Sequence, residues 1–162
     1  MMPNQKANRN YGFSLVEILI SLAILAIGLL AIAGLQITSL RSNNSAYLYS
    51  QATFASYDIM DRMRANRNHA LAEFYNLELD FLENDDIINI TENFLNNPEI
   101  PQVIYDDILY WITNLSNNLP QLRKVSIGLN ADIATVVIKW NESRSEIEEE
   151  QDLTEFRTQS QL

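Results

Sequence analysis

The chain has 162 residues, of which 11 are Lys or Arg and 21 are Asp or Glu, leaving a formal net charge of -10 at pH 7. Such an acidic chain is a poor partner for nucleic acid, because the phosphate backbone repels it. The chain contains no cysteine, which excludes disulfides, thiolate metal sites and a cysteine nucleophile. Four glycines and four prolines are few for a small all-β fold, so the composition favours one domain with a large helical share.

The first twelve residues form a short basic segment. They include Lys6 and Arg9 and no acidic residue, and an apolar stretch follows soon after them. Because positive charge is retained on the cytoplasmic side of a membrane, this segment predicts a cytoplasmic N-terminus and an exported C-terminal part.

The apolar stretch from Ile18 to Leu40 contains 23 residues without a charged side chain. As a helix it would be roughly 35 Å long, enough to cross a hydrocarbon core of about 30 Å. The core helix of a soluble protein would show a polar face, and this stretch shows none before Gln36. A cleaved secretory signal is also disfavoured, because Leu35 and Ile37 continue the apolar pattern past Gly34.

Glu17 lies at the start of this apolar stretch, where a plain signal anchor would not need an acid. A carboxylate at membrane depth costs on the order of 2 to 4 kcal/mol unless it is paired. The next cation along the chain is Arg41. Cleavage between Gly12 and Phe13 would create an α-amino group that could pair with Glu17 of a neighbouring subunit. Glu17 is therefore predicted to be an assembly contact.

Gly28 and Gly34 are the two glycines of the predicted membrane helix, and glycine has poor helix propensity. They are six positions apart and so do not form a Gly-xxx-Gly dimer motif. Two interpretations remain open: the glycines are packing positions, or they let the helix unwind locally when the subunit leaves the membrane.

No proline occurs between Pro3 and Pro98, so a single helix can run from Phe13 to about Leu71. One face of its second half is apolar, and two surface salt bridges are expected, Asp58 with Arg62 and Asp61 with Arg64. The apolar positions recur at steps of three and four: Leu48, Ala52, Ala55, Ile59 and Met63.

The C-terminal half predicts a short helix and a small sheet. Ile104 to Leu115 has the spacing of an amphipathic helix. Two segments rich in Val and Ile, Lys124 to Leu129 and Ala134 to Trp140, read as a β-hairpin. A last strand is predicted from Leu153 to Thr158, and Trp111 and Trp140 are expected in the core.

The sequence offers no catalytic constellation. His69 is the only histidine, and it is expected at the surface near a helix end. The acidic run from Glu142 to Glu155 lacks the alternating ligands and central glycine of a calcium loop, and so do the acids from Asp80 to Asp86. We therefore expect no enzyme activity, no cofactor and no metal site.

The order of features at the N-terminus resembles the class III signal of type IV prepilins. A short basic leader ends in Gly12, Phe13 follows as the first mature residue, Glu17 stands fifth after the cut, and the aliphatic run follows at once. Within that superfamily, the stretch from Ser50 to Arg67 resembles the PilV-type minor pilins, the type IV pilus modification family. The resemblance covers about the first 70 residues well and the rest loosely.

This resemblance implies an α+β, type IV pilin-like fold, with a long N-terminal helix packed on a small antiparallel sheet. It implies a leader at residues 1–12, a transmembrane and assembly helix at 13–41 and a periplasmic head at 42–162. A prepilin peptidase would cut after Gly12 and methylate Phe13. The implied partners are other minor and major pilins and the inner-membrane assembly platform, in pilus assembly and twitching motility.

Location and alternatives follow from the same resemblance. The protein would wait in the inner membrane with its head in the periplasm and then enter the pilus at the cell surface. Two other functions stay open: a minor pseudopilin of a type II secretion system, which shares the N-terminal features, and a signal-anchored periplasmic binding domain. The absence of a cysteine pair and of Gly-rich turns departs from the PilV pattern.

Overall fold

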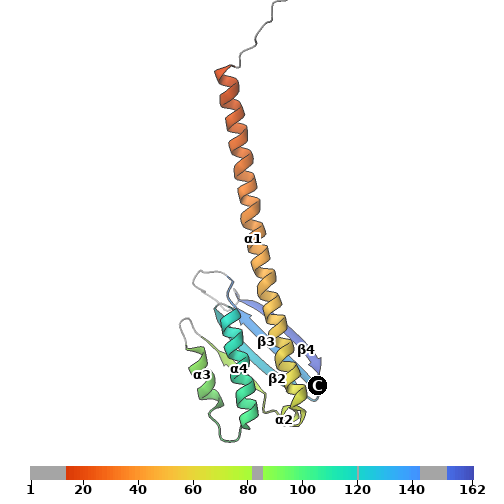
Figure 1. Cartoon of the computed structure of the whole chain (residues 1–162). Coiled ribbons are helices and arrows are strands. Elements are labelled where there is room, and N and C mark those ends of the chain that lie inside the picture. The colour runs from red at the N-terminus through yellow and green to blue at the C-terminus, as the bar shows by residue number, and fades with distance from the viewer. Residues whose placement is uncertain (1–13, 82–85, 120, 143–152) are drawn as a thin grey trace, which may run out of the picture. The chain divides into compact units, whose positions relative to one another are not determined.

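A computed structural model describes residues 14–81, 86–119, 121–142 and 153–162. The chain divides into two compact units, Met1–Asn43 and Asn44–Leu162. The elements in chain order are α1 (Leu15–Ala65), α2 (Arg67–Leu71), β1 (Leu77–Asp80), α3 (Ile87–Leu95), α4 (Gln102–Asn118), β2 (Leu122–Asn130), β3 (Ile133–Trp140) and β4 (Thr154–Gln161). Figure 1 shows these elements.

The described part of the first unit is helical and belongs to α1. From Leu15 to Leu40 every side chain is exposed, including large aliphatic ones such as Leu30, at 73%. The absence of a buried face agrees with the charge-free sequence, and α1 is the one helix among the described residues that is long and apolar enough to span a membrane.

The second unit is a four-stranded antiparallel sheet with helices on one face. The strand order is β1-β2-β3-β4, so each strand pairs with its neighbour in sequence order. The segment of α1 after Asn44 and helix α4 cover the same face of the sheet (Figure 1). The long helix on a small antiparallel sheet confirms the α+β, type IV pilin-like fold expected from the sequence.

The core lies between these helices and the sheet. Helix α1 contributes one apolar face, which contains the predicted Leu48, Ala52, Ile59 and Met63. The predicted Ala55 is only half-buried at the edge of the core. From the sheet come alternate residues of β2 and β3, and both Trp111 and Trp140 are at most 1% exposed, as expected. The largest fully buried side chains also include Tyr75, Met60, Ile104, Ile108, Ile112 and Leu119.

The predicted hairpin is present, with β2 and β3 joined by a turn of two residues. Asn130 pairs with Ile133, which leaves Ala131 and Asp132 as the loop. Ala131 has a φ of 56°, in the left-handed region that a two-residue hairpin turn requires at its first position. Thus the turn is tight without a glycine, at a local cost of about 1 kcal/mol.

The long helix ends earlier than the sequence pattern suggested. Helix α1 stops at Ala65, and the apolar pattern up to Leu71 belongs to the separate five-residue helix α2. Asn66 stands at the break, and its side-chain amide donates hydrogen bonds to the Tyr75 hydroxyl and to the Asp107 carboxylate. These side-chain contacts hold Asn66 at the junction of the two helices, while its backbone N–H still donates to the Arg62 carbonyl at 2.9 Å.

Two elements were not expected from the sequence. Strand β1 is only four residues long, and α3 starts with Asp86, whose carboxylate accepts a hydrogen bond from the backbone N–H of Asn89 at 3.1 Å. Strand β4 runs from Thr154 to Gln161, later than the predicted Leu153 to Thr158. Most of the acidic run, residues 143–152, lies outside the described residues.

Candidate functional site

The predicted processing site, Gly12 and Phe13, lies outside the described residues, which begin at Ser14. Its cleavage and methylation stay predictions. The described chain enters helix α1 directly after this junction, at Leu15.

Glu17 lies in the first turn of α1. A carboxylate near a helix N-terminus interacts favourably with the helix dipole, but its side chain makes no ion pair with another described residue. Its backbone carbonyl accepts a hydrogen bond from the Ser21 hydroxyl at 2.8 Å. Glu17 is exposed and so is open to a cation from another chain.

Gly28 and Gly34 lie within the continuous helix α1, and no neighbouring atom of the described residues stands within 4 Å of a Cβ built at either position. Within a single chain, therefore, no close packing requires glycine there. The Gly34 carbonyl also accepts a hydrogen bond from the Thr38 hydroxyl at 3.1 Å, a contact that often bends helices slightly.

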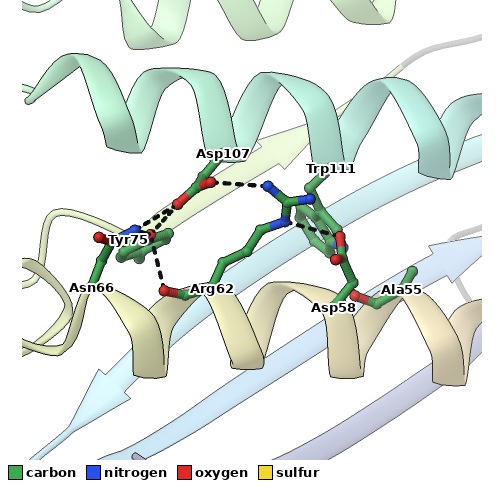
Figure 2. A network of polar contacts seen from close by, with 7 residues as sticks. All are labelled: Ala55, Asp58, Arg62, Asn66, Tyr75, Asp107 and Trp111. Atoms are coloured by element: carbon green, nitrogen blue, oxygen red, sulfur yellow. Dashed lines mark hydrogen bonds and ion pairs between the residues drawn. The ribbon is translucent and has the colours of Figure 1, made fainter.

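A polar network in the second unit links α1 and the residue after its end to α4 and to the segment before β1 (Figure 2). Asp107 of α4 is its centre: one carboxylate oxygen accepts from Arg62 at 3.0 Å, and the other from Asn66 at 2.9 Å and from the Tyr75 hydroxyl at 2.5 Å. Arg62 also donates to Asp58 at 3.1 Å, which confirms that predicted pair. The predicted Asp61 and Arg64 pair is present as well, at 2.6 Å.

One cation, Arg62, lies between the two carboxylates of this network, Asp58 and Asp107. Burial would lower the pKa of Arg62, but its hydrogen bonds to Asp58 and Asp107 outweigh that effect and raise the pKa. Burial and the hydrogen bond to Asp107 raise the pKa of the Tyr75 phenol well above its ordinary value. The guanidinium of Arg62 also stacks over the ring of Tyr110, 4.6 Å from its centroid.

This network fastens elements together. The Asp107 carboxylate accepts from three side chains, and the Arg62 guanidinium donates to two carboxylates. Trp111 adds a second tie between α4 and α1, since its indole N–H donates to the Ala55 carbonyl at 2.8 Å (Figure 2). Among the described residues no group of His, Asp and Glu could hold a metal ion.

The sequence indicated the pair of Arg62 with Asp58 from its spacing of four, but it did not indicate Asp107 or Tyr75. Asp106 and Asp107 are adjacent acids in α4. The helix period places Asp107 on the same face as the buried Ile104, Ile108 and Trp111. His69 lies in α2 with its ring edge toward Phe74, at a centroid distance of 6.2 Å.

Residues 7–33 match the prokaryotic N-terminal methylation motif. The match includes the predicted cleavage junction, Glu17 and Gly28, and it does not extend into the second unit. Comparison with curated proteins and with solved structures gives no match. The motif and the single apolar helix together support a membrane-anchored subunit of the type IV pilin or pseudopilin kind.

Proposed function

We propose that this protein is a non-enzymatic minor pilin, which is processed after Gly12 and takes part in priming or capping a type IV pilus. The observation that carries the proposal is the methylation motif at residues 7–33, which covers the start of α1, together with the stretch of α1 from Leu15 to Leu40, where every side chain is exposed. Proteins with a pilin-type leader are generally structural. Membership of the PilV family is the finer part of the proposal and is supported by the sequence from Ser50 to Arg67.

The proposal assigns a role to the exposed Glu17. In a bundle of processed subunits, its carboxylate would pair with the N-terminal ammonium of a neighbour, because an unpaired charge among apolar helices is costly. The partners in such a bundle are other pilins. The prepilin peptidase and the assembly platform act on the chain before it enters the bundle. The head would lie in the periplasm before assembly and at the cell surface afterwards.

Processing is tested by mass spectrometry of the native protein extracted from membranes. The expected N-terminal peptide starts with N-methylated Phe13, and Gly12→Val should prevent cleavage because a branched side chain hinders the peptidase. A chain that still starts at Met1, in cells that process other prepilins, would contradict the proposal.

Assembly is tested with Glu17→Ala, and Glu17→Gln serves as the variant of matched size. Both should be processed and inserted normally but recover fewer partner pilins on co-purification. Unchanged recovery and unchanged piliation would count against the pairing role of Glu17. Substituting both Gly28 and Gly34 by Ala tests the helix: local unwinding predicts less of the protein in sheared pili relative to membranes, and packing alone predicts an unchanged ratio.

A minor pseudopilin of a type II secretion system is the second candidate, because the methylation motif is shared by both assemblies. Deleting the gene separates the two functions. Loss of surface pili with normal protein secretion supports the minor pilin, and the opposite result supports the pseudopilin.

A further inference from the structure

Strand β4 is an open edge of the sheet. Within the described residues it pairs only with β3, over eight consecutive residues and without a register shift. It contains no proline and no bulge, two devices that commonly protect edge strands. A regular edge of this length can accept a further strand.

The hydrogen bonds at the end of β4 show which backbone groups are free for such a strand. The Leu162 N–H donates to the Asp132 carbonyl at 2.9 Å, one step beyond the pair of Ile133 with Gln161. Bonding alternates along an antiparallel ladder, so even-numbered residues of β4 bond to β3 and odd-numbered ones direct their N–H and C=O groups away from it. A contact of Arg64 with the Gln161 carbonyl, at 3.3 Å, agrees with this direction.

Arg64 also limits the usable length of the edge. Because its guanidinium takes the Gln161 carbonyl and contacts the Ser160 hydroxyl, that end of β4 is occupied. The odd residues that remain are Glu155, Arg157 and Gln159, all with exposed side chains. Together these three residues direct three N–H and three C=O groups outward along the free edge of β4.

The opposite edge of the sheet is better covered. On β1 the helix-facing residues Leu77 and Leu79 are 4% and 6% exposed, and Ile87 and Ile90 of α3 pack against the same core. On β4 the helix-facing residues are only half-buried, Phe156 among them. Phe156, the apolar residue among them, is thus only partly covered beside the open edge of β4.

The charges on the outer face of the sheet specify the chemistry of a partner. Glu155 already has a cation, because the Lys139 ammonium lies 3.4 Å from its carboxylate. Lys124 is likewise paired, with Glu78 and Asp80. The Arg157 side chain makes no ion pair or hydrogen bond with another described residue. An incoming strand with an acid opposite Arg157 would give this cation a cross-strand partner, as Glu155 has in Lys139.

We propose that the edge from Glu155 to Gln159 binds an extended segment of a different protein chain as a fifth strand. That segment carries an acidic side chain opposite Arg157 and apolar side chains on the helix-facing side, where they cover Phe156. Backbone hydrogen bonds supply the affinity, and the acid sets the register, since a shift by one residue would turn it to the apolar face. This inference does not depend on whether the protein enters a pilus.

The test uses the full chain in detergent micelles, labelled with ¹⁵N, and a synthetic peptide of nine residues. The peptide alternates threonine with valine and has aspartate at its centre, and the control peptide has lysine there. The aspartate peptide should shift the amide signals of Glu155, Arg157 and Gln159 more than those of Phe156 and Thr158. It should bind about two- to fivefold more tightly than the lysine peptide, as expected for one cross-strand charge pair.

Three variants of the chain make the result specific. Arg157→Glu should reverse the preference between the two peptides. Gln159→Pro removes one outward N–H without touching the backbone bonds to β3 and should weaken binding of both peptides. Gln159→Ala loses the same side-chain hydrogen bond to Thr135, at 3.0 Å, but keeps the N–H and should not weaken binding. Unshifted edge amides, or equal affinity for the two peptides, would overturn the proposal. So would shifts of the same amides on raising the protein concentration alone, because a second copy would then be the occupant.

Discussion

The indole N–H of Trp111 reaches across from α4 and donates to the backbone carbonyl of Ala55 in α1, at 2.8 Å. The other tryptophan, Trp140, is equally buried, but its indole N–H has no partner among the described residues. Two buried rings of the same kind thus differ by one hydrogen bond, which makes them a matched pair for measurement.

Replacing Trp111 by Phe should lower the free energy of unfolding by about 1 kcal/mol more than replacing Trp140 by Phe. Both variants lose similar ring area, but only the first loses a hydrogen bond, and the second removes an unsatisfied buried donor. Urea unfolding of the full chain in micelles, followed by circular dichroism, measures the difference. Equal destabilisation would show that the Trp111 to Ala55 bond contributes nothing net.

Asp107→Asn should destabilise the second unit by about 1 to 3 kcal/mol. An amide oxygen cannot replace a carboxylate that accepts from Arg62, Asn66 and Tyr75, and the cation of Arg62 would lose a partner in a partly buried place. The neighbouring Asp106→Asn is the control, since Asp106 is exposed and accepts only from Gln102, at 2.9 Å. Its effect should stay within about 0.5 kcal/mol in the same unfolding experiment.

The raised pKa of Tyr75 predicts a loss of stability in alkali. Below pH about 10 the phenol is protonated in both the folded and the unfolded chain, and its contribution is fully present. Above that pH the unfolded phenol ionises while the folded one keeps its proton, so the free energy of unfolding falls as pH rises. The measurement compares the free energy of unfolding of the wild type with that of Tyr75→Phe between pH 9 and 11, a range that lies roughly one unit on either side of the ordinary phenol pKa. A constant difference between the two proteins over this range would contradict the prediction.

Ser56→Ala should leave stability unchanged or raise it by up to about 1 kcal/mol. The Ser56 side chain is 0% exposed in the α1 interface, and its hydroxyl has no partner among the described residues. Removing a buried polar group without a hydrogen bond recovers its desolvation cost. Ser50→Ala is the control on the same helix, because the Ser50 hydroxyl is exposed and bonds to Ala46. A clear loss of stability in Ser56→Ala would reveal a partner, such as a bound water.

The sequence predicts those parts of the fold that have a strong local pattern. The period of α4 through Ile108, Trp111 and Leu115 and the two β-branched strands around Ala131 are such parts. The end of α1 could not be predicted, because Asn66 is held by Asp107, 41 positions away in sequence. Strand β1 was missed because four residues are too few to show an alternation.

The candidate site likewise has residues that could be recognised from the sequence and residues that could not. Glu17 and the junction before it are recognisable because charge, small residue and apolar run follow one another in the sequence. The centre of the polar network is not recognisable from the sequence, because its members come from α1, α4 and the segment before β1. The helix period places Asp107 and not Asp106 beside the apolar face of α4, but it does not tell which residues of α1 and of the segment before β1 the carboxylate meets.

The order of the strands also bears on how fast the second unit can fold. Each strand pairs with the next one along the chain, so the sheet can form by adding strands in sequence, with β4 last. The contacts that close the core are as distant in sequence as the pairing of Leu77 with Ile127, since Ala55 meets Trp111 across 56 residues and Tyr49 stacks edge-on with Trp140 at 5.3 Å. Loop-closure entropy makes such distant contacts slow to form. In a chain that emerges N-terminus first, the apolar face of α1 therefore stays uncovered until α4 and β3 have been made.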